Sequence, residues 1–535
     1  MTKRYDALVI GAGHNGLVCA FYLARAGLRV RMVERRAIVG GAAVTEEFHP
    51  GFRNSVASYT VSLLQPKVIK DMGLVERGYR VIERPISNFL PQEDGRYLKL
   101  GGGLAQTQAE FAKFSKRDAE TLPRYYAALE RVADVLRDLA LRAPPNVGDG
   151  LKAWFEGARQ GRRLAGLPIE QQRDMLDLFT KSARSFLDGW FESEAVKAAF
   201  GFDAVVGNYA SPDSPGSAYV LLHHVFGEVN GKKGAWGHCV GGMGSITRLM
   251  ADACRDAGVE IGIESPVAQV LVDGSRVAGI RLESGEEVAA AIVIANIGPK
   301  LLYERLMTPD DLPPDFLRRI RSFKAGSGTF RMNVALSALP TFACLPEPGE
   351  HHQSGIILAP TLDYMDRAYT DARAHGWSRA PIVEMLIPST VDDSLAPPGM
   401  HVASLFCQQF APSLPEGRNW DDEEQTAADT IIDTVERYAP GFRASILGQM
   451  RLSPAGLERQ FGLTNGDIMH GHMSLDQLWA ARPVLGHGSY RGPLKGLYMC
   501  GAGTHPGGGV TGAPGHNAAH AILADRSLIG RLLQR

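Results

Sequence analysis

The sequence has few cysteines and no closely spaced pair of them. Its six cysteines are scattered over 535 residues, and no CxxC pattern occurs. A thioredoxin-like dithiol and a zinc ribbon both need such pairs, so neither is predicted and no metal site is expected. Isolated thiols are typical of small core residues in a reducing compartment, which predicts a cytoplasmic protein.

Long apolar runs and an excess of one charge are missing as well. No apolar run reaches the roughly 18 residues that span a bilayer, so we expect no integral membrane protein, whereas a peripheral membrane contact stays open. The formal net charge of −1 gives no reason to expect nucleic acid as a partner. The first predicted strand begins at Tyr5, so we expect no signal peptide.

The clearest pattern that is present is a glycine loop near the N-terminus. An apolar run ending at Ile10 predicts a buried strand, and Gly11, Gly13 and Gly16 follow in GxGxxG spacing before a predicted helix. Such glycines let the backbone turn tightly and approach a pyrophosphate, and the helix N-terminus offers N–H groups to the phosphates. The loop therefore predicts a dinucleotide site.

Charged residues at the end of the next predicted strand, 29–33, refine this prediction. Glu34 lies where a carboxylate is expected to bond a ribose hydroxyl, and it disfavours the 2′-phosphate of NADP. Arg35 and Arg36 follow directly, and two roles are open for them: they contact a phosphate, or they form a solvated pair on the surface. Next come Gly40 and Gly41, which let the chain pass close to a second segment of ligand.

A second glycine-rich loop lies near the C-terminus. The strand predicted over 497–500 leads into a loop from Gly501 to Gly515, and a helix is predicted from His516 onward. Two glycine loops at opposite ends of the chain fit a long cofactor with a diphosphate and a ring system, which favours FAD over NAD. The alternative, a flexible linker, does not suit a position between a strand and a helix.

A third segment completes the predicted cofactor domain. Gly241–Gly244 precede a helix predicted over 245–257, followed by a strand over 259–263 and a three-stranded antiparallel meander over 267–294 that ends near Asn296. The predicted fold class is α/β, a two-dinucleotide-binding-domain flavoprotein with a Rossmann-like FAD domain and a mixed α+β substrate domain.

The domains are predicted to be discontinuous. We assign 1–75, 226–299 and 491–535 to the FAD-binding domain, and 76–225 and 300–490 to a substrate-binding or cap domain. In the latter we expect helices over 105–141, 170–188, 193–202 and 422–438 and strands over 329–336, 381–387 and 401–410, the strands forming a sheet that faces the flavin.

These segments together resemble the phytoene desaturase-like flavoproteins. The resemblance rests on the N-terminal fingerprint with Gly40-Gly41, on Trp236–Gly244, on the strand end at Asn296 and on Gly501–Val510. Pro50–Tyr59 and Ser62–Pro66 look closest to a branch named after a pyridine nucleotide-disulfide oxidoreductase domain protein, although no redox dithiol is visible in this chain.

The resemblance implies FAD as cofactor and a set of binding residues. The pyrophosphate is expected over the first glycine loop, the ribose at Glu34, the adenine at the backbone of Val267, and the ribityl chain and isoalloxazine at the C-terminal loop. Many related flavoproteins have an arginine after the glycine pair where this chain has Ala42 and Ala43, which leaves the phosphate contacts there open. The candidate residues are Gly11, Gly13, Asn15, Gly16, Glu34, Arg35, Gly41, Ala42, Val267, Asn296, Gly501, Gly503, Val510, Thr511 and Gly512.

The predicted activity is hydride transfer between flavin N5 and an apolar, isoprenoid or lipid-like substrate, as in a desaturase, saturase or isomerase. Alternatives are a flavin amine or porphyrinogen oxidase, and a non-catalytic flavin-binding interaction protein. Oxygen or a quinone is the expected electron acceptor. No catalytic residue is assigned, because the flavin can accept a hydride unaided.

His505 either transfers a proton or holds its loop. Neither the substrate nor the oligomeric state follows from the sequence.

Two further patterns are weaker. The segment 151–167 mixes aromatic, basic and apolar residues, so it is either a membrane-facing helix or an ordinary cap helix. A second dinucleotide site is not expected. Gly241–Gly244 has no predicted strand directly before it, and Gly101–Gly103 has no clear helix start after it and lacks a partner acid.

Overall fold

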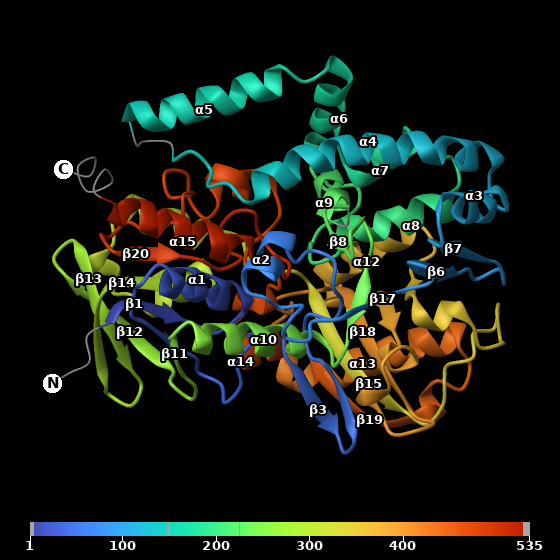
Figure 1. Ribbon diagram of the computed structural model, residues 1–535. Coiled ribbons are helices and arrows are strands. Elements are labelled where there is room, and N and C mark those ends of the chain that lie inside the picture. Colours follow the sequence, from blue (N-terminus) through green and yellow to red (C-terminus); the bar gives the residue numbers. More distant parts are fainter. Residues whose placement is uncertain (1–4, 147–149, 224, 528–535) are drawn as a thin grey trace.

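The computed structural model describes residues 5–146, 150–223 and 225–527. The chain forms two large sheets that lie side by side, each covered by helices (Figure 1). The predicted α/β fold class is confirmed. The strands of the first sheet come only from ranges predicted for the FAD domain, and those of the second sheet only from the other ranges; the domain boundaries themselves stay a prediction.

The first sheet is a parallel core extended by a meander. Its order is β11-β2-β1-β14-β13-β12, and β20 pairs with the second half of β14. The strands are β1 (Tyr5–Ile10), β2 (Val30–Val33), β11 (Glu260–Gly262), β12 (Val267–Asp273), β13 (Arg276–Leu282), β14 (Glu287–Ala295) and β20 (Leu497–Met499). The carboxyl ends of β1, β2 and β14 therefore meet at one edge, where ligands bind in open parallel sheets.

Three helices pack on one face of this sheet. They are α1 (His14–Arg25), α10 (Met243–Asp256) and α15 (Ala513–Arg526), with α1 between the other two (Figure 1). Gly515 lies against α1, because a Cβ there would overlap the carbonyl oxygen of Asn15. The two glycine-loop helices, from opposite ends of the chain, are thus held side by side.

The second sheet is mostly antiparallel, with the order β19-β15-β18-β17-β16-β6-β7. Its strands are β6 (Asn88–Pro91), β7 (Tyr97–Leu100), β15 (Thr329–Leu336), β16 (Gly355–Leu358), β17 (Trp377–Leu386), β18 (His401–Phe410) and β19 (Ile446–Leu452). Alternate residues face opposite sides: Val383 and Met385 pack with α13 (Trp420–Tyr438), whereas Ile382 packs with a group of cap helices.

The cap is helical, and all of its helices except α12 come from the first half of the chain. It comprises α3 (Leu104–Ala112), α4 (Lys116–Ala140), α5 (Gly150–Ala165), α6 (Ile169–Thr180), α7 (Ala183–Asp188), α8 (Glu194–Val205), α9 (Ala218–His223) and α12 (Leu362–His375). Connecting elements are β3 (Thr45–His49), β4 (Phe52–Ser55), α2 (Pro66–Asp71), β5 (Val81–Glu83), β8 (Glu228–Val229), β9 (Lys232–Lys233), β10 (Gly237–Cys239), α11 (Pro314–Ser322) and α14 (Pro454–Phe461).

Several expectations for these regions were wrong in detail. The segments 105–141 and 170–188 each form two helices, because Ser115 caps α4 and Ser182 caps α7 with their hydroxyls. Strands β6, β7, β16 and β19 were not predicted. The strand β10 does precede Gly241, and α3 does follow Gly103, so those two arguments against a second dinucleotide site fail.

The described residues lack two features. None of their helices combines the length and the apolar character needed to cross a bilayer. They also contain no group of three or more His, Cys, Asp or Glu side chains placed to hold a metal ion.

Candidate cofactor site

The N-terminal glycine loop is packed too tightly for side chains. Gly11 has a φ of 91°, which favours glycine, and Gly13 forms a bridge with Gly40. A Cβ on Gly13 would lie 2.9 Å from Asn296 Nδ2, and a Cβ on Gly41 would lie 3.3 Å from the Cα of Gly13. The two predicted glycine segments therefore lie against each other at the edge of the sheet.

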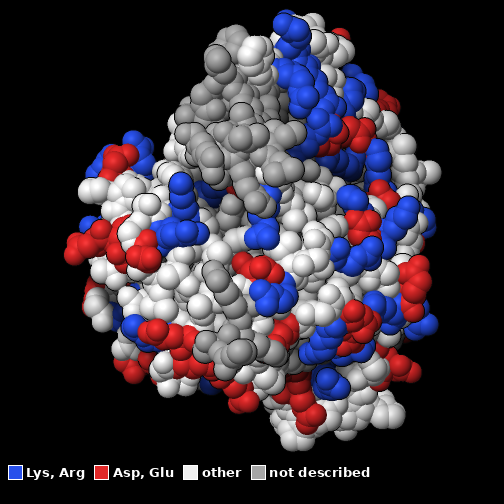
Figure 2. Space-filling view, turned by 60° about the vertical axis from the view of Figure 1, so that its left-hand side comes forward, with Lys and Arg blue, Asp and Glu red and all other residues white. Residues whose placement is uncertain are grey.

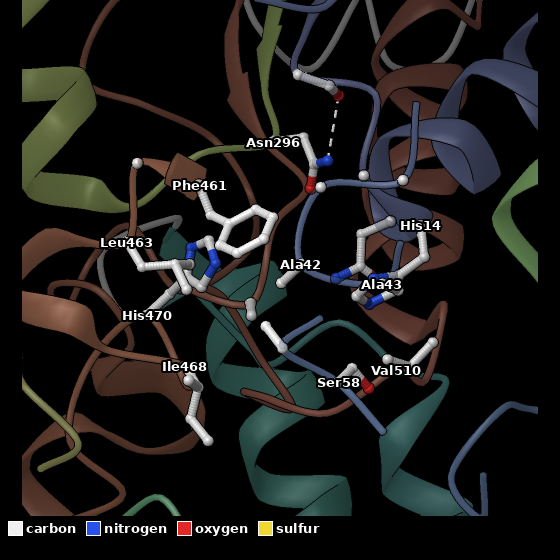
Figure 3. A pocket seen from close by; sticks show the side chains of 18 of the residues that line it. His14, Ala42, Ala43, Ser58, Asn296, Phe461, Leu463, Ile468, His470 and Val510 are labelled. Atoms are coloured by element: carbon white, nitrogen blue, oxygen red, sulfur yellow. Dashed lines mark hydrogen bonds between the residues drawn. The ribbon is translucent and has the colours of Figure 1, made fainter. Parts of the chain in front are cut away.

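Asn296, directly after β14, ties this edge together. Its Nδ2 donates to the carbonyl oxygen of Gly11 at 3.1 Å, and its backbone N–H donates to Ile10 at 2.8 Å. Figure 3 shows this side chain among the residues that surround the cavity. The predicted site residue Asn296 thus orients the glycine loop itself.

Glu34 is buried at the end of β2 and holds the same loop. The side chain is 6% exposed. Its Oε2 accepts a hydrogen bond from Ala12 N at 2.8 Å, and its Oε1 accepts one from Arg36 N at 3.0 Å. The carboxylate therefore stabilises the turn in addition to the ribose contact predicted for it.

The two arginines after Glu34 differ in their partners. Arg36 pairs with Glu46 at 2.8 Å and lies over the ring of Phe461 at 5.0 Å. Arg35 donates to the carbonyl oxygen of Arg459 at 2.9 Å. Both line the cavity, so either guanidinium is available to a phosphate, and neither is a purely solvated residue.

A cavity of about 420 Å³ runs along this edge, and we call it the cofactor cavity. Figure 3 shows that its labelled side chains surround a common space. Ten predicted site residues line it: Gly11, Gly13, Asn15, Glu34, Arg35, Gly41, Ala42, Val267, Asn296 and Val510.

The other five predicted residues do not line this cavity. Cβ atoms on Gly16, Gly501, Gly503 and Gly512 would meet the Gly11 carbonyl oxygen, Asn296, Pro299 and the side chains of Val18 and Val68, respectively. These glycines permit close packing behind the loops. Thr511 lines a neighbouring cavity instead.

Several residues that line the cofactor cavity were missed. They come from the segment 57–64, from Trp236 and from 461–470. His14 Nε2, Asn15 Oδ1 and His470 Nδ1 are buried and have no hydrogen-bond partner among the described residues. Burial lowers the pKa of both His14 and His470 to about 4, so both imidazoles are neutral at pH 7.

A buried arginine holds loops that line the cofactor cavity. Arg482 is fully buried, and its guanidinium donates to the carbonyl oxygens of Ala502, His472, Gln477, Met469 and Gly471. Burial lowers its pKa to about 10. Arg482 thereby fixes two loops that line the cofactor cavity, at Met469 and at Ala502.

Two further cavities adjoin the cofactor cavity. The first, about 580 Å³, shares Leu63 with it and is lined mainly by apolar side chains of α4 and α6; we call it the apolar cavity. The second, about 570 Å³, shares Tyr59, Thr60 and Trp236 and includes the charged residues Arg84, Glu130, Asp203, Lys233 and Glu384; we call it the polar chamber.

His505 lines the apolar cavity and not the cofactor cavity. Its Nε2 lies 3.1 Å from the carbonyl oxygen of Leu139, its ring meets that of Trp479 edge-on, and its own carbonyl accepts from the Tyr490 hydroxyl at 2.9 Å. Burial lowers its pKa to about 4. Of the two roles considered, these contacts favour holding the loop.

Cysteine placement corrects one inference from the sequence. The thiols of Cys19 and Cys500 are not isolated, because Cys19 on α1 and Cys500, directly before the C-terminal glycine loop, lie close enough to interact. Both are buried and free, and burial raises the pKa of Cys500 well above its usual range. The Cys500 thiol is therefore a protonated core residue at neutral pH.

The residues of the cofactor cavity fit FAD. Closely packed glycines, with no space for a Cβ, line the part expected to hold the phosphates, and Glu34 lies where the ribose is expected. Buried polar atoms of His14, Asn15 and His470 have no hydrogen-bond partner among the described residues, so they are available to a ligand. The sequence carried no signal for His14 or His470, because a single histidine in a loop has no pattern of its own.

Comparisons with known proteins agree with this reading. The model of the flavin containing amine oxidoreductase family matches residues 16–330. The chain is 42% identical to pyridine nucleotide-disulfide oxidoreductase domain-containing protein 2 of Rattus norvegicus, over 98% of this chain and 94% of the relative. It is 26% identical to a phytoene desaturase (lycopene-forming) of Pseudescherichia vulneris, over 96% and 98%. The resemblance stated from the motifs is confirmed.

A solved structure shares the whole fold. An oxidoreductase from Methanosarcina mazei aligns with a TM-score of 0.61 at 16% identity, covering 97% of this chain and all of the other. At this identity the likeness shows the fold alone.

Proposed function

The chain belongs to the flavin-containing amine oxidoreductase family and is an FAD-dependent oxidoreductase, and from this premise we propose that it transfers a hydride between flavin N5 and an apolar, isoprenoid or lipid-like substrate. When bound, the flavin supplies the two-electron chemistry. The chain supplies the binding, the orientation and the exclusion of water.

The observation that carries this proposal is the apolar cavity. It is lined by Val135, Leu136 and Leu139 of α4 and by Met175, Leu176 and Phe179 of α6, and it meets the cofactor cavity at Leu63. Its volume of about 580 Å³ lies within the range of ligand sites of about 300–1,000 Å³. An apolar chain held there would extend from the cofactor cavity. The relative named for phytoene, a hydrocarbon, supports the same substrate class.

Flavin reduction under anaerobic conditions tests this proposal. The purified protein is expected to be yellow, to release FAD on heating, and to bleach when mixed with an apolar isoprenoid or acyl compound that it oxidises. Leu136→Lys, which places a charge in the apolar cavity, should slow bleaching, and Leu475→Lys at an exposed position should not. Bleaching by amines alone would contradict the apolar substrate.

An amine substrate is the second candidate, and the polar chamber favours it. Asp203 and Glu384 line this chamber together with aromatic rings of Tyr59, Tyr125 and Trp236. Burial raises the pKa of both carboxyl groups, and the charge of Glu384 raises the pKa of Asp203 further. A bound ammonium group would stabilise the carboxylates and would face aromatic rings. Reduction by primary amines, abolished in Asp203→Asn, would favour this candidate.

Partners beyond the substrate are also proposals. We expect oxygen or a quinone as electron acceptor and no nucleic acid. The helix α5, at the top of Figure 1, carries Arg159, Arg162 and Arg163 beside an exposed Phe155, and Figure 2 shows basic residues gathered at the upper edge of one face. This arrangement supports a peripheral membrane contact. Side chains 151–154, part of the same pattern, lie outside the described residues. Co-flotation with anionic vesicles tests the contact.

A further inference from the structure

A row of side chains crosses the second sheet on the face that meets the cofactor cavity. Arg331 on β15 lies opposite Phe406 on β18, and Phe406 lies opposite Glu384 on β17. Phe406 lines the cofactor cavity and Glu384 lines the polar chamber. Arg331 is 1% exposed and Glu384 is 7% exposed. Charged residues are almost never buried this deeply unless they are paired or functional.

Tyr59 connects this row with the cofactor cavity. Its hydroxyl donates a hydrogen bond to Glu384 Oε2. Its ring packs on Phe406 at 5.0 Å between centroids, and the guanidinium of Arg331 lies 4.7 Å from the centre of the ring. Tyr59 lines both the cofactor cavity and the polar chamber, so the hydrogen-bonded pair spans the boundary between them.

The geometry leaves part of Glu384 available. Glu384 Oε1 has no hydrogen-bond partner among the described residues, and it lies over Gly355, where a Cβ would be 2.9 Å away. Arg84, which donates to Thr60 Oγ1 at 2.7 Å, also lines the chamber but forms no ion pair with Glu384 within the described part of the chain. The carboxyl group is therefore neither neutralised by a direct partner nor sealed off.

Five charged or titratable groups interact electrostatically with Glu384. They are Tyr59, Arg84, Arg331, Cys407 and Asp203. Burial raises the pKa of Glu384, while the Tyr59 hydroxyl, Arg84 and Arg331 act in the opposite direction and favour the carboxylate. Opposed influences of this kind are how proteins bring a carboxyl group into the range useful for acid–base work.

We propose that Tyr59 and Glu384 form the proton-transfer pair of this oxidoreductase, with the Tyr59 hydroxyl touching the substrate and Glu384 as the base behind it. The inference rests on the proposed function. In an oxidation, the substrate loses a hydride to the flavin and a proton from the adjacent atom. The Tyr59 oxygen takes that proton as its own hydrogen passes to the Glu384 carboxylate. The substrate gains a double bond, and the new carboxylic acid later releases its proton through the polar chamber.

The midpoint potential of bound FAD, titrated with dithionite from pH 5 to pH 9, tests the pair without any substrate. Because Tyr59 lines the cofactor cavity, reduction of FAD held there would add charge near the pair, and proton uptake by Glu384 should appear as a change of slope in the plot of potential against pH. Glu384→Gln should lose this change of slope. Asp203→Asn, which removes another carboxyl group of the polar chamber, should keep it.

Tyr59→Phe gives a second, milder variant that retains the ring packing. It removes a donor that stabilises the carboxylate, so the change of slope should move to higher pH. Three outcomes would contradict the proposed pair. They are a plot without a change of slope for the wild type, an unchanged change of slope in Glu384→Gln, and the loss of the change of slope in Asp203→Asn. These outcomes do not depend on which compound bleaches the flavin, so failure of the proposed substrate class is recognised separately.

Discussion

A side chain at Gly13 would clash with Asn296 on one side, and on the other side it would occupy the space predicted for the cofactor. A Cβ would lie 2.9 Å from Asn296 Nδ2, and the branches of a valine would reach into the cofactor cavity. Gly13→Val should therefore abolish FAD binding, measured by the flavin absorbance of the purified protein. Gly161→Val, at a position with nothing within 4 Å of its Cβ, is the control. A folded Gly13→Val protein with a normal flavin spectrum would show that the loop lies elsewhere than at the pyrophosphate.

Glu34 has two roles at the scale of one residue. Its carboxylate holds Ala12 N and Arg36 N, and a ribose contact is predicted for it. Glu34→Ala should weaken FAD binding by about 1.5–3 kcal/mol, the range for hydrogen bonds to charged groups, which is roughly 10- to 150-fold in Kd. Titration of the apoprotein with FAD measures this, with the exposed Glu286→Ala as a control. An unchanged Kd would mean that the ribose is held by other groups.

At the scale of elements, the contact between α1 and α15 depends on the absence of one side chain. Gly515 brings the first turn of α15 against the backbone at Asn15 and Cys19. Gly515→Ala should destabilise the protein by about 1–3 kcal/mol, the usual cost of overpacking. Thermal unfolding of the apoprotein measures this loss. Gly161→Ala, in open space within α5, should be neutral or slightly stabilising. Equal unfolding temperatures for the two variants would disprove the close approach of the helices.

At the scale of the whole molecule, the two sheets offer one dinucleotide fingerprint. Gly101–Gly103 and Gly241–Gly244 follow β7 and β10, which are antiparallel strands outside the parallel core of the first sheet. We therefore expect NADH and NADPH not to reduce the flavin quickly, because hydride transfer needs the nicotinamide held about 3–3.5 Å from N5. Anaerobic stopped-flow mixing measures this. Bleaching within seconds that saturates with either nicotinamide would reveal a second nucleotide site.

Much of the cofactor site could be predicted from the sequence because its parts are local. Between Tyr5 and Glu34 the chain forms a strand, a glycine loop, a helix, a second strand and an acid in direct succession. Consecutive residues determine the backbone geometry of each of these parts. The meander that ends before Asn296 and the strand before Gly501 were predicted for the same reason. FAD as cofactor follows from these local patterns, and the family comparison confirms it.

Only the tertiary structure decided which distant segments contact one another. Arg331, Phe406 and Glu384 lie on three different strands, and sheet pairing puts them in one row beside Tyr59, which comes from a distant part of the chain. The acid within the apolar run of β17 was a visible signal, but its partners were not. Cys19 and Cys500 likewise meet only because α1 and the C-terminal loop share a face of the first sheet. Periodicity and glycine spacing report the backbone of one segment, whereas side-chain clusters depend on how segments pack, which no local pattern encodes.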